Sequence, residues 1–352
     1  MEKVEKADIK SMTLKELQDW LGQQGEPAFR GKQLFSWIHE KFVSSFDEMT
    51  NLPKTMREKL MGSTIWTVHQ PLQVLTSQLD QTKKFLFGLQ DGNVIESVYM
   101  QYKHGNSVCI STQVGCRMGC KFCASTLEGL VRNLTAAEML EQIYSVQRIT
   151  GERISHVVLM GSGEPLDNFY HVLKFLKLIS CENGLHISQR NITISTCGLV
   201  EQIRQLAAEC VQCTLALSLH APDNETRKEL MPIAYRYPLQ DVLDACRYYF
   251  EKTGRRITFE YSLVAGINDN KQEAVKLAHC VRGLNCHINL IPVNPIKERD
   301  YKQSDKIKIR QFKQTLETFG LQVTVRREMG RDIQGACGQL RRSFIKQQAG
   351  GN

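Results

Sequence analysis

From residue 107 onward the chain repeats one pattern, a short apolar run of strand length followed by an amphipathic run of helix length. The strand-type runs lie at 107–112, 156–160, 191–195, 214–219, 257–263 and 287–292. The helix-type runs lie at 135–150, 168–180, 200–209, 239–252, 271–282 and 306–319. Six consecutive strand–helix units predict a parallel sheet with helices outside, either closed into a partial barrel or open and doubly wound. Both forms bind ligands at the C-terminal ends of their strands.

The segments on either side of this core follow other patterns. Residues 1–75 predict a small helical domain, in which Thr13 and Glu16 form a capping box and further helices cover 29–42 and 46–60. The last of these is interrupted at residues 51–53. Residues 76–106 predict a β-hairpin, because apolar runs at 83–89 and 94–100 flank Asp91-Gly92.

The core is expected to span residues 107–325, with a last short strand at 322–326. A basic C-terminal segment then covers 326–352, and its residues 327–340 predict a polar loop.

Composition excludes several classes of protein. With 352 residues, 42% of them hydrophobic and 23% charged, the chain is a globular protein rather than a disordered one. No apolar run approaches the ~18 residues of a membrane-spanning helix. Residues 1–10 are charged and contain no apolar stretch, which argues against a secretory signal. Twelve irregularly spaced cysteines in such a chain indicate a reducing cytoplasm.

The net charge of +8 is concentrated at one end of the chain. Residues 301–352 hold eleven basic and four acidic residues, a net charge of +7, whereas residues 1–60 hold ten of each. A basic segment of this kind suggests a polyanionic partner such as nucleic acid, and a solvated surface is an equal alternative.

The strongest chemical signal is a C-x3-C-x2-C run formed by Cys116, Cys120 and Cys123. Three thiolates in one compact loop can hold one face of a [4Fe–4S] cluster and leave the fourth iron open. A structural zinc site with Cys109 or His104 as fourth ligand and a set of unrelated buried thiols are the alternatives. Seven other cysteines lie in or beside apolar segments and are expected in the core: Cys181, Cys197, Cys210, Cys213, Cys246, Cys280 and Cys286.

This motif, after the first strand of a (βα)6 chain, resembles the signature of the radical S-adenosylmethionine (SAM) superfamily. The run Met160-Gly-Ser-Gly163-Glu164-Pro165 resembles the loop that holds the methionine part of SAM there. Segments 107–116, 218–220, 289–294 and 335–340 are, more narrowly, similar to the RlmN/Cfr family of RNA adenine methyltransferases. The resemblance implies an α/β fold: a partial (βα)6 radical SAM barrel with a small helical N-terminal domain and a C-terminal extension.

The resemblance also implies a two-cysteine mechanism. A first SAM methylates Cys337, and a 5′-deoxyadenosyl radical from a second SAM removes a hydrogen atom from that methyl group. The methylene radical adds to the adenine, and Glu96 accepts the proton from the substrate carbon. Cys109 then attacks Cys337, which releases the product and leaves a disulfide. The cofactors implied are one [4Fe–4S] cluster on Cys116, Cys120 and Cys123, and two SAM molecules per turnover.

The remaining implied contacts concern SAM and RNA. The SAM-binding residues matched by the resemblance are Gly163, Glu164, Ser195, Ser218, Leu219, His220 and Asn294. Residues 289–294 and 327–332 favour methylation of adenine C2 in 23S ribosomal RNA, and also in tRNA. The alternatives are C8 methylation, which confers antibiotic resistance, and a zinc-stabilised RNA-binding module without catalysis. RNA contacts are expected from five arginines around Cys337: Arg326, Arg327, Arg331, Arg341 and Arg342. We further expect a monomer in the cytoplasm, away from membranes, reduced by a flavodoxin or ferredoxin.

Overall fold

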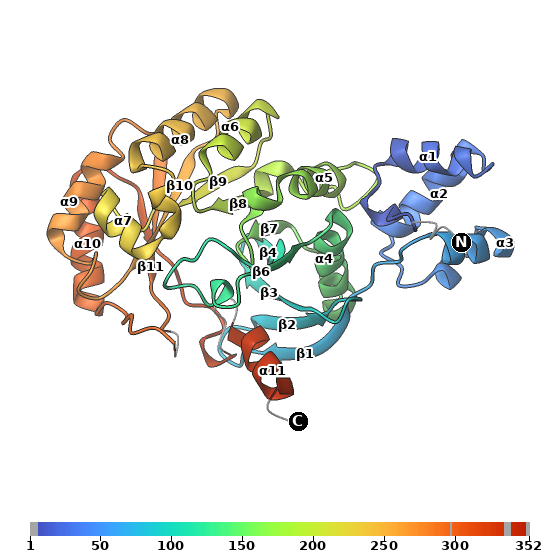
Figure 1. The fold of residues 1–352 in the computed structure, drawn as a ribbon, viewed down its shortest axis with the longest axis horizontal. Helices are drawn as coiled ribbons and strands as arrows, with labels where there is room; N and C mark the ends of the chain where they lie inside the picture. Colours follow the sequence, from blue (N-terminus) through green and yellow to red (C-terminus); the bar gives the residue numbers. More distant parts are fainter. Residues whose placement is uncertain (1–5, 296–297, 334–338, 350–352) are drawn as a thin grey trace.

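One ten-stranded mixed sheet organises the computed structural model, which describes residues 6–295, 298–333 and 339–349 (Figure 1). The strands of this sheet are β1 (Gln70–Thr76), β2 (Lys83–Gly88), β3 (Val94–Tyr102), β4 (Gly105–Cys109), β7 (His156–Leu159), β8 (Ile192–Thr196), β9 (Thr214–Ser218), β10 (Ile257–Leu263), β11 (Cys286–Pro292) and β12 (Val323–Val325). They lie side by side in that order, so the sheet grows as the chain proceeds.

From β4 to β12 all neighbouring strands are parallel. The six predicted strands of the core are confirmed to within three residues at each end, and the short strand predicted at 322–326 is β12. β1 and β12 are the two edges, and no pairing joins them within the described residues. The sheet is therefore the open, partial form of barrel that the superfamily resemblance implies.

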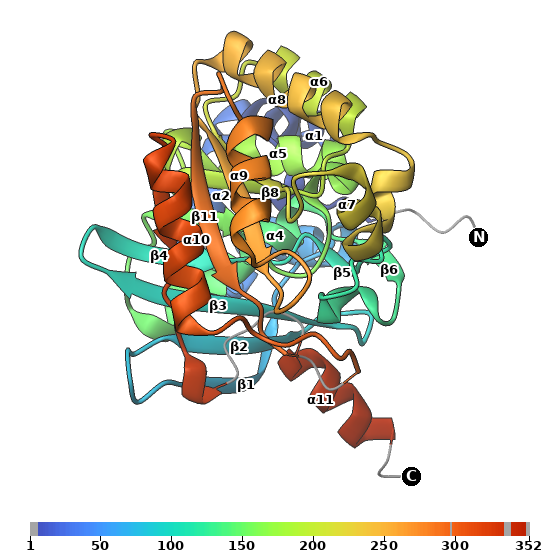
Figure 2. The same ribbon diagram turned by 90° about the vertical axis from the view of Figure 1, so that its left-hand side faces the viewer.

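Helices cover the outer face of the parallel strands, as Figures 1 and 2 show. They are α4 (Ala136–Thr150), α5 (Phe169–Ile179), α6 (Val200–Ala208), α8 (Leu239–Thr253), α9 (Lys271–Cys280) and α10 (Lys306–Thr318). Strand β10 shows why the layers form: Phe259 and Tyr261 are fully buried on the helix side, whereas Glu260 and Ser262 alternate with them and line a pocket on the inner side.

The predicted hairpin is confirmed as β2 and β3, and it is joined to the core by hydrogen bonds. β3 pairs antiparallel with β4, with Val98 opposite Cys109, and β1 pairs antiparallel with β2. The three antiparallel strands thus extend the inner surface of the barrel beyond its first parallel strand.

The N-terminal helices are α1 (Leu14–Gln23), α2 (Ala28–His39) and α3 (Lys54–Ser63). Thr13 and Glu16 make the predicted capping box. The expected helix at 46–60 is two elements, a 3-10 turn at Phe46–Glu48 and α3, because Pro53 begins a new helix. These helices share one continuous apolar core with the barrel.

Several short elements were not predicted. Strands β5 (Gln113–Gly115) and β6 (Leu130–Asn133) form a separate two-stranded sheet, and helix α7 (Asn224–Leu230) follows β9. The polar loop expected at 327–340 is wrong in part, because a 3-10 turn occupies Arg331–Ile333 and helix α11 (Gln339–Ala349) begins before residue 340. The apolar side chain of Leu340 packs on Leu86 and Val94, which explains why the chain becomes helical there. Other 3-10 turns are Ile9–Ser11, Ala124–Thr126, Pro165–Asn168, Gln189–Asn191 and Pro232–Tyr235.

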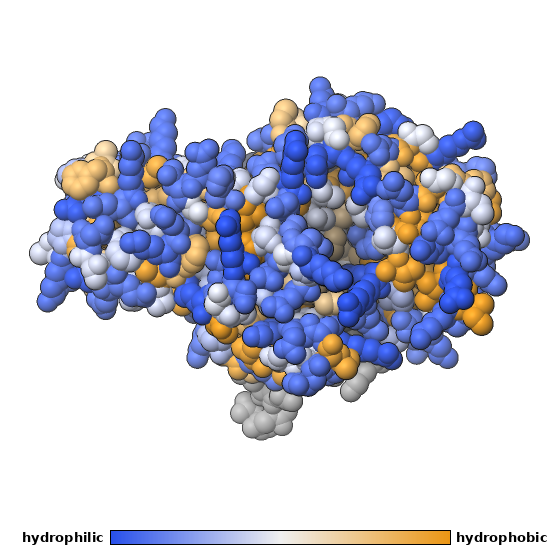
Figure 3. All heavy atoms as spheres, turned by 180° about the vertical axis from the view of Figure 1, so that it is seen from behind, coloured by the Kyte–Doolittle hydropathy of each residue, from blue (hydrophilic) through white to orange (hydrophobic). Residues whose placement is uncertain are grey.

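Hydrophilic residues dominate the face seen in Figure 3, with hydrophobic residues interspersed among them. Among the described residues, no helix combines the length and the apolar character needed to cross a bilayer.

Candidate active site

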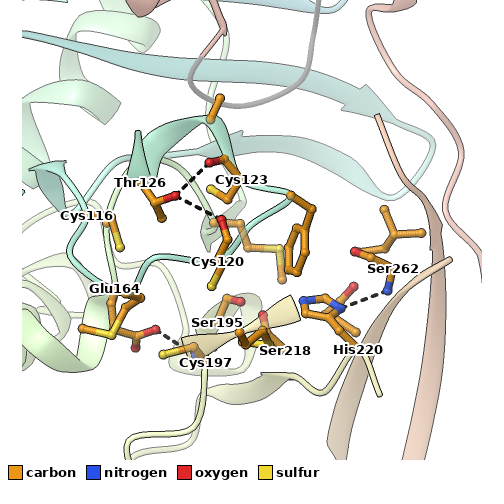
Figure 4. A pocket seen from close by; sticks show the side chains of 18 of the residues that line it. Cys116, Cys120, Cys123, Thr126, Glu164, Ser195, Cys197, Ser218, His220 and Ser262 are labelled. Atoms are coloured by element: carbon orange, nitrogen blue, oxygen red, sulfur yellow. Dashed lines mark hydrogen bonds between the residues drawn. The ribbon is translucent and has the colours of Figure 1, made fainter. Parts of the chain in front are cut away.

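A pocket of about 250 Å³ opens at the C-terminal ends of the parallel strands (Figure 4). Nine of the residues predicted to bind the cluster or SAM line it: Cys116, Cys120, Cys123, Gly163, Glu164, Ser195, Ser218, His220 and Asn294. They come from segments spread over almost 180 residues of the chain. The parallel topology brings them together, because every strand delivers its last residue to the same edge of the sheet.

The loop that carries the three cysteines is folded by close backbone contacts. Gly115 has a φ of 76°, and a Cβ there would lie 2.0 Å from the carbonyl oxygen of Gly129. That carbonyl accepts the N–H of Cys116 at 2.8 Å. Glycine is therefore required at position 115 to turn the chain into the first cysteine.

The second half of the loop is held from two sides. The Thr126 hydroxyl lies within hydrogen-bond distance of the carbonyl oxygens of Cys120 and Cys123, at 3.0 and 2.9 Å. The N–H of Lys121 donates to the carbonyl of Leu230, the last residue of α7, at 2.9 Å. The backbone positions of the cysteines are thus fixed by the protein itself.

The chemistry of these thiols fits an iron–sulfur cluster. Burial raises the pKa of the Cys116 thiol to about 12 and that of Cys120 well above its ordinary value. At neutral pH such buried thiols become thiolates only beside a strong positive charge, which cluster iron supplies.

A single zinc ion fits less well. Within the described part of the chain, no three His, Cys, Asp or Glu side chains converge closely enough to hold one metal ion. In a [4Fe–4S] cluster each thiolate binds a different iron atom, so its ligands stand farther apart. His104, one proposed fourth zinc ligand, stacks on Tyr102 before the start of β4, at the opposite end of the strand from the cysteine loop. The position of His104 therefore argues against it as a fourth zinc ligand.

Glu164 is fixed in the turn that follows β7. Its two carboxylate oxygens accept the N–H groups of Leu166 at 3.1 Å and Cys197 at 2.8 Å. Burial raises the pKa of Glu164, and these two hydrogen bonds act against that rise. The preceding Gly163 has a φ of 112°, and a Cβ there would lie 2.7 Å from Gln113. The turn therefore presents a rigid carboxylate to the pocket, suited to a cationic ammonium group.

His220 presents a defined hydrogen-bond donor. Its Nδ1 accepts the N–H of Ser262 at 2.9 Å, so the ring proton is on Nε2. Burial lowers the pKa of His220 to about 3, with a smaller contribution from the charge of Arg227. The imidazole is therefore neutral at physiological pH. Phe122 from the cysteine loop packs edge-on against the ring, with centroids 4.7 Å apart.

The other predicted SAM-binding residues take two kinds of position. Ser195 and Ser218 end or nearly end β8 and β9, and Asn294 follows β11; all three line the pocket. Leu219 does not line it. Its side chain is buried in the core, and its N–H donates to the carbonyl of Glu260 at 3.0 Å.

Glu96 and Cys109 lie on the same inner face of the sheet, next to the pocket. Cys109 pairs with Val98, two residues from Glu96, and packs with Met160, which lines the pocket. Glu96 is only 5% exposed, and Lys84 lies 3.2 Å from its carboxylate. The N–H of Arg341 donates to the same carboxylate.

Cys337 lies outside the described residues. Of the arginines expected around it, Arg326, Arg327 and Arg331 are exposed, and Arg326 lines the pocket. Arg341 is an exception, because its side chain is buried and donates to the carbonyl of Val94 at 2.9 Å. The expectation that Arg341 contacts RNA phosphate is therefore wrong for this conformation.

Sequence reasoning missed several residues of the site. Cys197 is buried in the core as expected but also lines the pocket, and Cys210 is exposed rather than buried. Glu260 also lines the pocket, where burial raises its pKa and Asn289 donates to it at 2.8 Å. A charged residue inside the apolar run 257–263 was the available signal for Glu260. Nothing local in the sequence marks Cys197.

The fold and its parts match known proteins. The Radical SAM superfamily matches residues 110–278, and the "Ribosomal RNA large subunit methyltransferase N-terminal domain" matches residues 7–65. The crystal structure of a radical SAM methyltransferase from Sphaerobacter thermophilus superimposes with a TM-score of 0.91 and 41% identity, covering 95% of this chain and 98% of that one.

Curated relatives extend this similarity over nearly the whole chain. Proteins from Lachnospira eligens and Clostridium perfringens strain 13, both named probable dual-specificity RNA methyltransferase RlmN, are 58% and 57% identical to it over 339 residues. These alignments cover 96% of this chain and 97% and 98% of the relatives. The chain therefore belongs to the RlmN family of dual-specificity RNA methyltransferases, which are radical SAM enzymes that use a [4Fe–4S] cluster and SAM.

Proposed function

We propose that this enzyme methylates C2 of adenine in 23S ribosomal RNA and in tRNA, with Cys337 as the methyl carrier, Cys109 as the second cysteine and Glu96 as the base. The observation that carries this proposal is the docking of the C-terminal segment on Glu96. Arg341, four residues after Cys337 in the sequence, donates its N–H to that carboxylate. Because Cys109 lies on the same face of the sheet as Glu96, these two proposed residues lie together beside the pocket.

Glu96 is suited to accept a proton from carbon. Lys84 forms a buried ion pair with its carboxylate at 3.2 Å, and the Arg341 N–H orients one of the carboxylate oxygens. Lys84 comes from the neighbouring strand β2, opposite Val98, so the hairpin contributes both the base and its counter-charge.

The pocket divides into two proposed binding regions. Cys116, Cys120 and Cys123 would hold the cluster, which when bound supplies the electron that cleaves SAM to a 5′-deoxyadenosyl radical. The remaining residues bind SAM around it: Gly163, Glu164, Ser195, Ser218, His220 and Asn294 by lining the pocket, and Leu219 by fixing the backbone that carries His220. The Glu164 carboxylate receives the SAM ammonium group, and the neutral His220 donates from Nε2.

The remaining partners follow from this chemistry. Arg326 lines the pocket, Arg327 and Arg331 are exposed, and all three would neutralise RNA phosphates while the target adenine leaves its stack. A flavodoxin or ferredoxin would deliver the electron. We propose that the enzyme acts as a cytoplasmic monomer, with residues 1–75 as an accessory helical domain, 76–106 as the hairpin, 107–325 as the barrel core and 326–352 as the segment that carries Cys337.

The test is anaerobic methylation of a 23S rRNA fragment and of tRNA, followed by nucleoside mass spectrometry. We expect 2-methyladenosine from both RNAs with the wild-type enzyme and none with Glu96→Gln. Cys109→Ala should accumulate a covalent protein–RNA adduct that nuclease digestion removes, because the resolving thiol is gone. Cys213→Ala is the matched control and should turn over normally. Cys213 is a buried thiol immediately before β9, at the opposite end of that strand from the pocket.

Two results would overturn parts of this proposal. If 8-methyladenosine is the product, the C2 assignment is wrong and the alternative branch of the family is right. If Cys109→Ala turns over as fast as Cys213→Ala, another thiol is the second cysteine.

A further inference from the structure

Arg227, on helix α7, is a fully buried arginine with little to balance it. Its side chain is 0% exposed. Nη2 donates to the carbonyl oxygen of Cys197 at 2.6 Å, whereas Nε and Nη1 have no hydrogen-bond partner among the described residues. No ion pair of Arg227 with a described carboxylate is formed either. Since an arginine stays protonated in proteins, α7 carries an uncompensated positive charge into the interior.

This charge lies directly behind the loop that would hold the cluster. The residue that Arg227 contacts, Cys197, lines the pocket and donates its N–H to Glu164. The end of α7 accepts the N–H of Lys121, which lies between Cys120 and Cys123. Met231, the next residue after α7, lines the pocket as well. Arg227 is therefore one layer away from the proposed ligands.

Arg227 also acts on the pocket electrostatically. Its charge works to lower the pKa of His220, which lines the pocket, although burial has the larger influence. A buried cation favours negative charge at the same place.

We propose that Arg227 makes the cluster easier to reduce by holding a fixed positive charge behind it. Cluster and three thiolates together are negatively charged, and the one-electron reduction that precedes SAM cleavage adds one further negative charge. The electron comes from the low-potential donor that the reaction requires, and no bond or proton changes place. The net charge around a cluster is one of the quantities that set its potential. This inference rests on the cluster position given in the proposed function. Arg227 acts through its charge on the cluster and is not a catalytic residue.

The test is an EPR-monitored redox titration of the reconstituted enzyme without SAM or RNA, after iron and sulfide have been counted. Arg227→Gln keeps a donor for the Cys197 carbonyl and removes the charge, and Arg227→Lys keeps the charge. At a fixed potential, we expect the ratio of reduced to oxidised cluster to fall roughly tenfold in R227Q, a shift of about 59 mV for a one-electron couple. R227K should stay within about twofold of the wild type, because the Coulomb energy depends on charge more than on shape.

Arg255→Met is the matched control. Arg255 is a partly buried arginine that contacts Thr214 at the start of β9, away from the pocket, so its removal should leave the potential unchanged. A wild-type potential in R227Q with four iron atoms per chain would overturn the proposal. If R227Q takes up no iron while R227K does, Arg227 serves cluster assembly and the proposal is also wrong. A wild-type enzyme without a cluster would instead contradict the proposed function.

Discussion

Two groups of buried charge in this molecule differ in how they are balanced. Where the N-terminal helices meet the barrel, Lys10 donates to Glu141 of α4 at 2.9 Å, and Arg148 pairs with the same carboxylate. Lys10 and Glu141 are both essentially unexposed. Beneath the pocket, the equally buried Arg227 has no carboxylate among its described partners.

The group formed by Lys10, Glu141 and Arg148 is a structural joint, whereas the group around Arg227 belongs to a functional site. A buried pair whose charges cancel contributes to stability only as long as both partners are present. Burial works to raise the pKa of Glu141, but the charges of Lys10 and Arg148 outweigh it and keep the pKa low. Under the pocket, Arg227 has no carboxylate among its described partners, and burial raises the pKa values of the thiols there. Such a site needs an additional charged group, and the joint does not.

The largest expected effect follows from removing a thiol of the pocket. Cys120→Ala should lose the cluster, with less than about a tenth of the iron and sulfide of the wild type, because two thiolates cannot hold it in place. RNA methylation should fall below detection. The unfolding free energy of the metal-free protein should change by no more than about 1 kcal/mol. Iron and sulfide analysis after anaerobic reconstitution decides this, and full iron content in Cys120→Ala would contradict the assignment.

Breaking the joint should lower the stability of the protein and leave cluster binding intact. Glu141→Gln leaves Lys10 and Arg148 without their shared anion and should cost about 3–5 kcal/mol in urea unfolding. The folded fraction should still take up four iron atoms. The double variant Lys10→Met with Glu141→Leu should recover at least half of that loss, because only the partly exposed Arg148 is then left without the anion. A double variant as unstable as Glu141→Gln would show that packing, and not charge balance, holds the joint.

The regular elements of the barrel were predictable because their signals are local. The strand at 257–263 alternates apolar and polar residues, and the helix at 136–150 begins with a capping box at Thr135 and Glu138. Helix α7 was missed because the run Asn-Glu-Thr-Arg-Lys-Glu-Leu is short and polar. Helix α7 lies between the cysteine loop and the core, and this position buries Arg227. From the sequence alone this arginine would be expected at the surface.

The site was predictable only where a motif carried it. The cysteine loop and Glu164 have compact sequence patterns, whereas the burial of Glu96 depends on Lys84 from β2 and on Arg341 from α11, some 245 residues away. The same long-range contact removed Arg341 from the expected RNA surface. Partners brought together by tertiary structure leave no trace in local sequence.

The joint and the pocket each contain a buried histidine. Both histidines predict that the stability of the protein depends on pH, which is a smaller effect. Burial lowers the pKa of His39 to about 3 at the joint, where its Nδ1 lies 2.7 Å from the Tyr144 hydroxyl, and it lowers the pKa of His220 to about 3 at the pocket. Both histidines are neutral in the folded protein, and in the unfolded chain they take up protons below about pH 6.5. The unfolded state then binds more protons, so stability falls as the pH decreases from 6.5 toward 3.

Between pH 6.5 and 5 each histidine should account for about 2 kcal/mol of this loss. Urea unfolding at the two pH values measures it. His39→Gln and His220→Gln should each remove about one histidine's share of the dependence, and an unchanged dependence in His39→Gln would mean that this histidine is not held neutral at the joint.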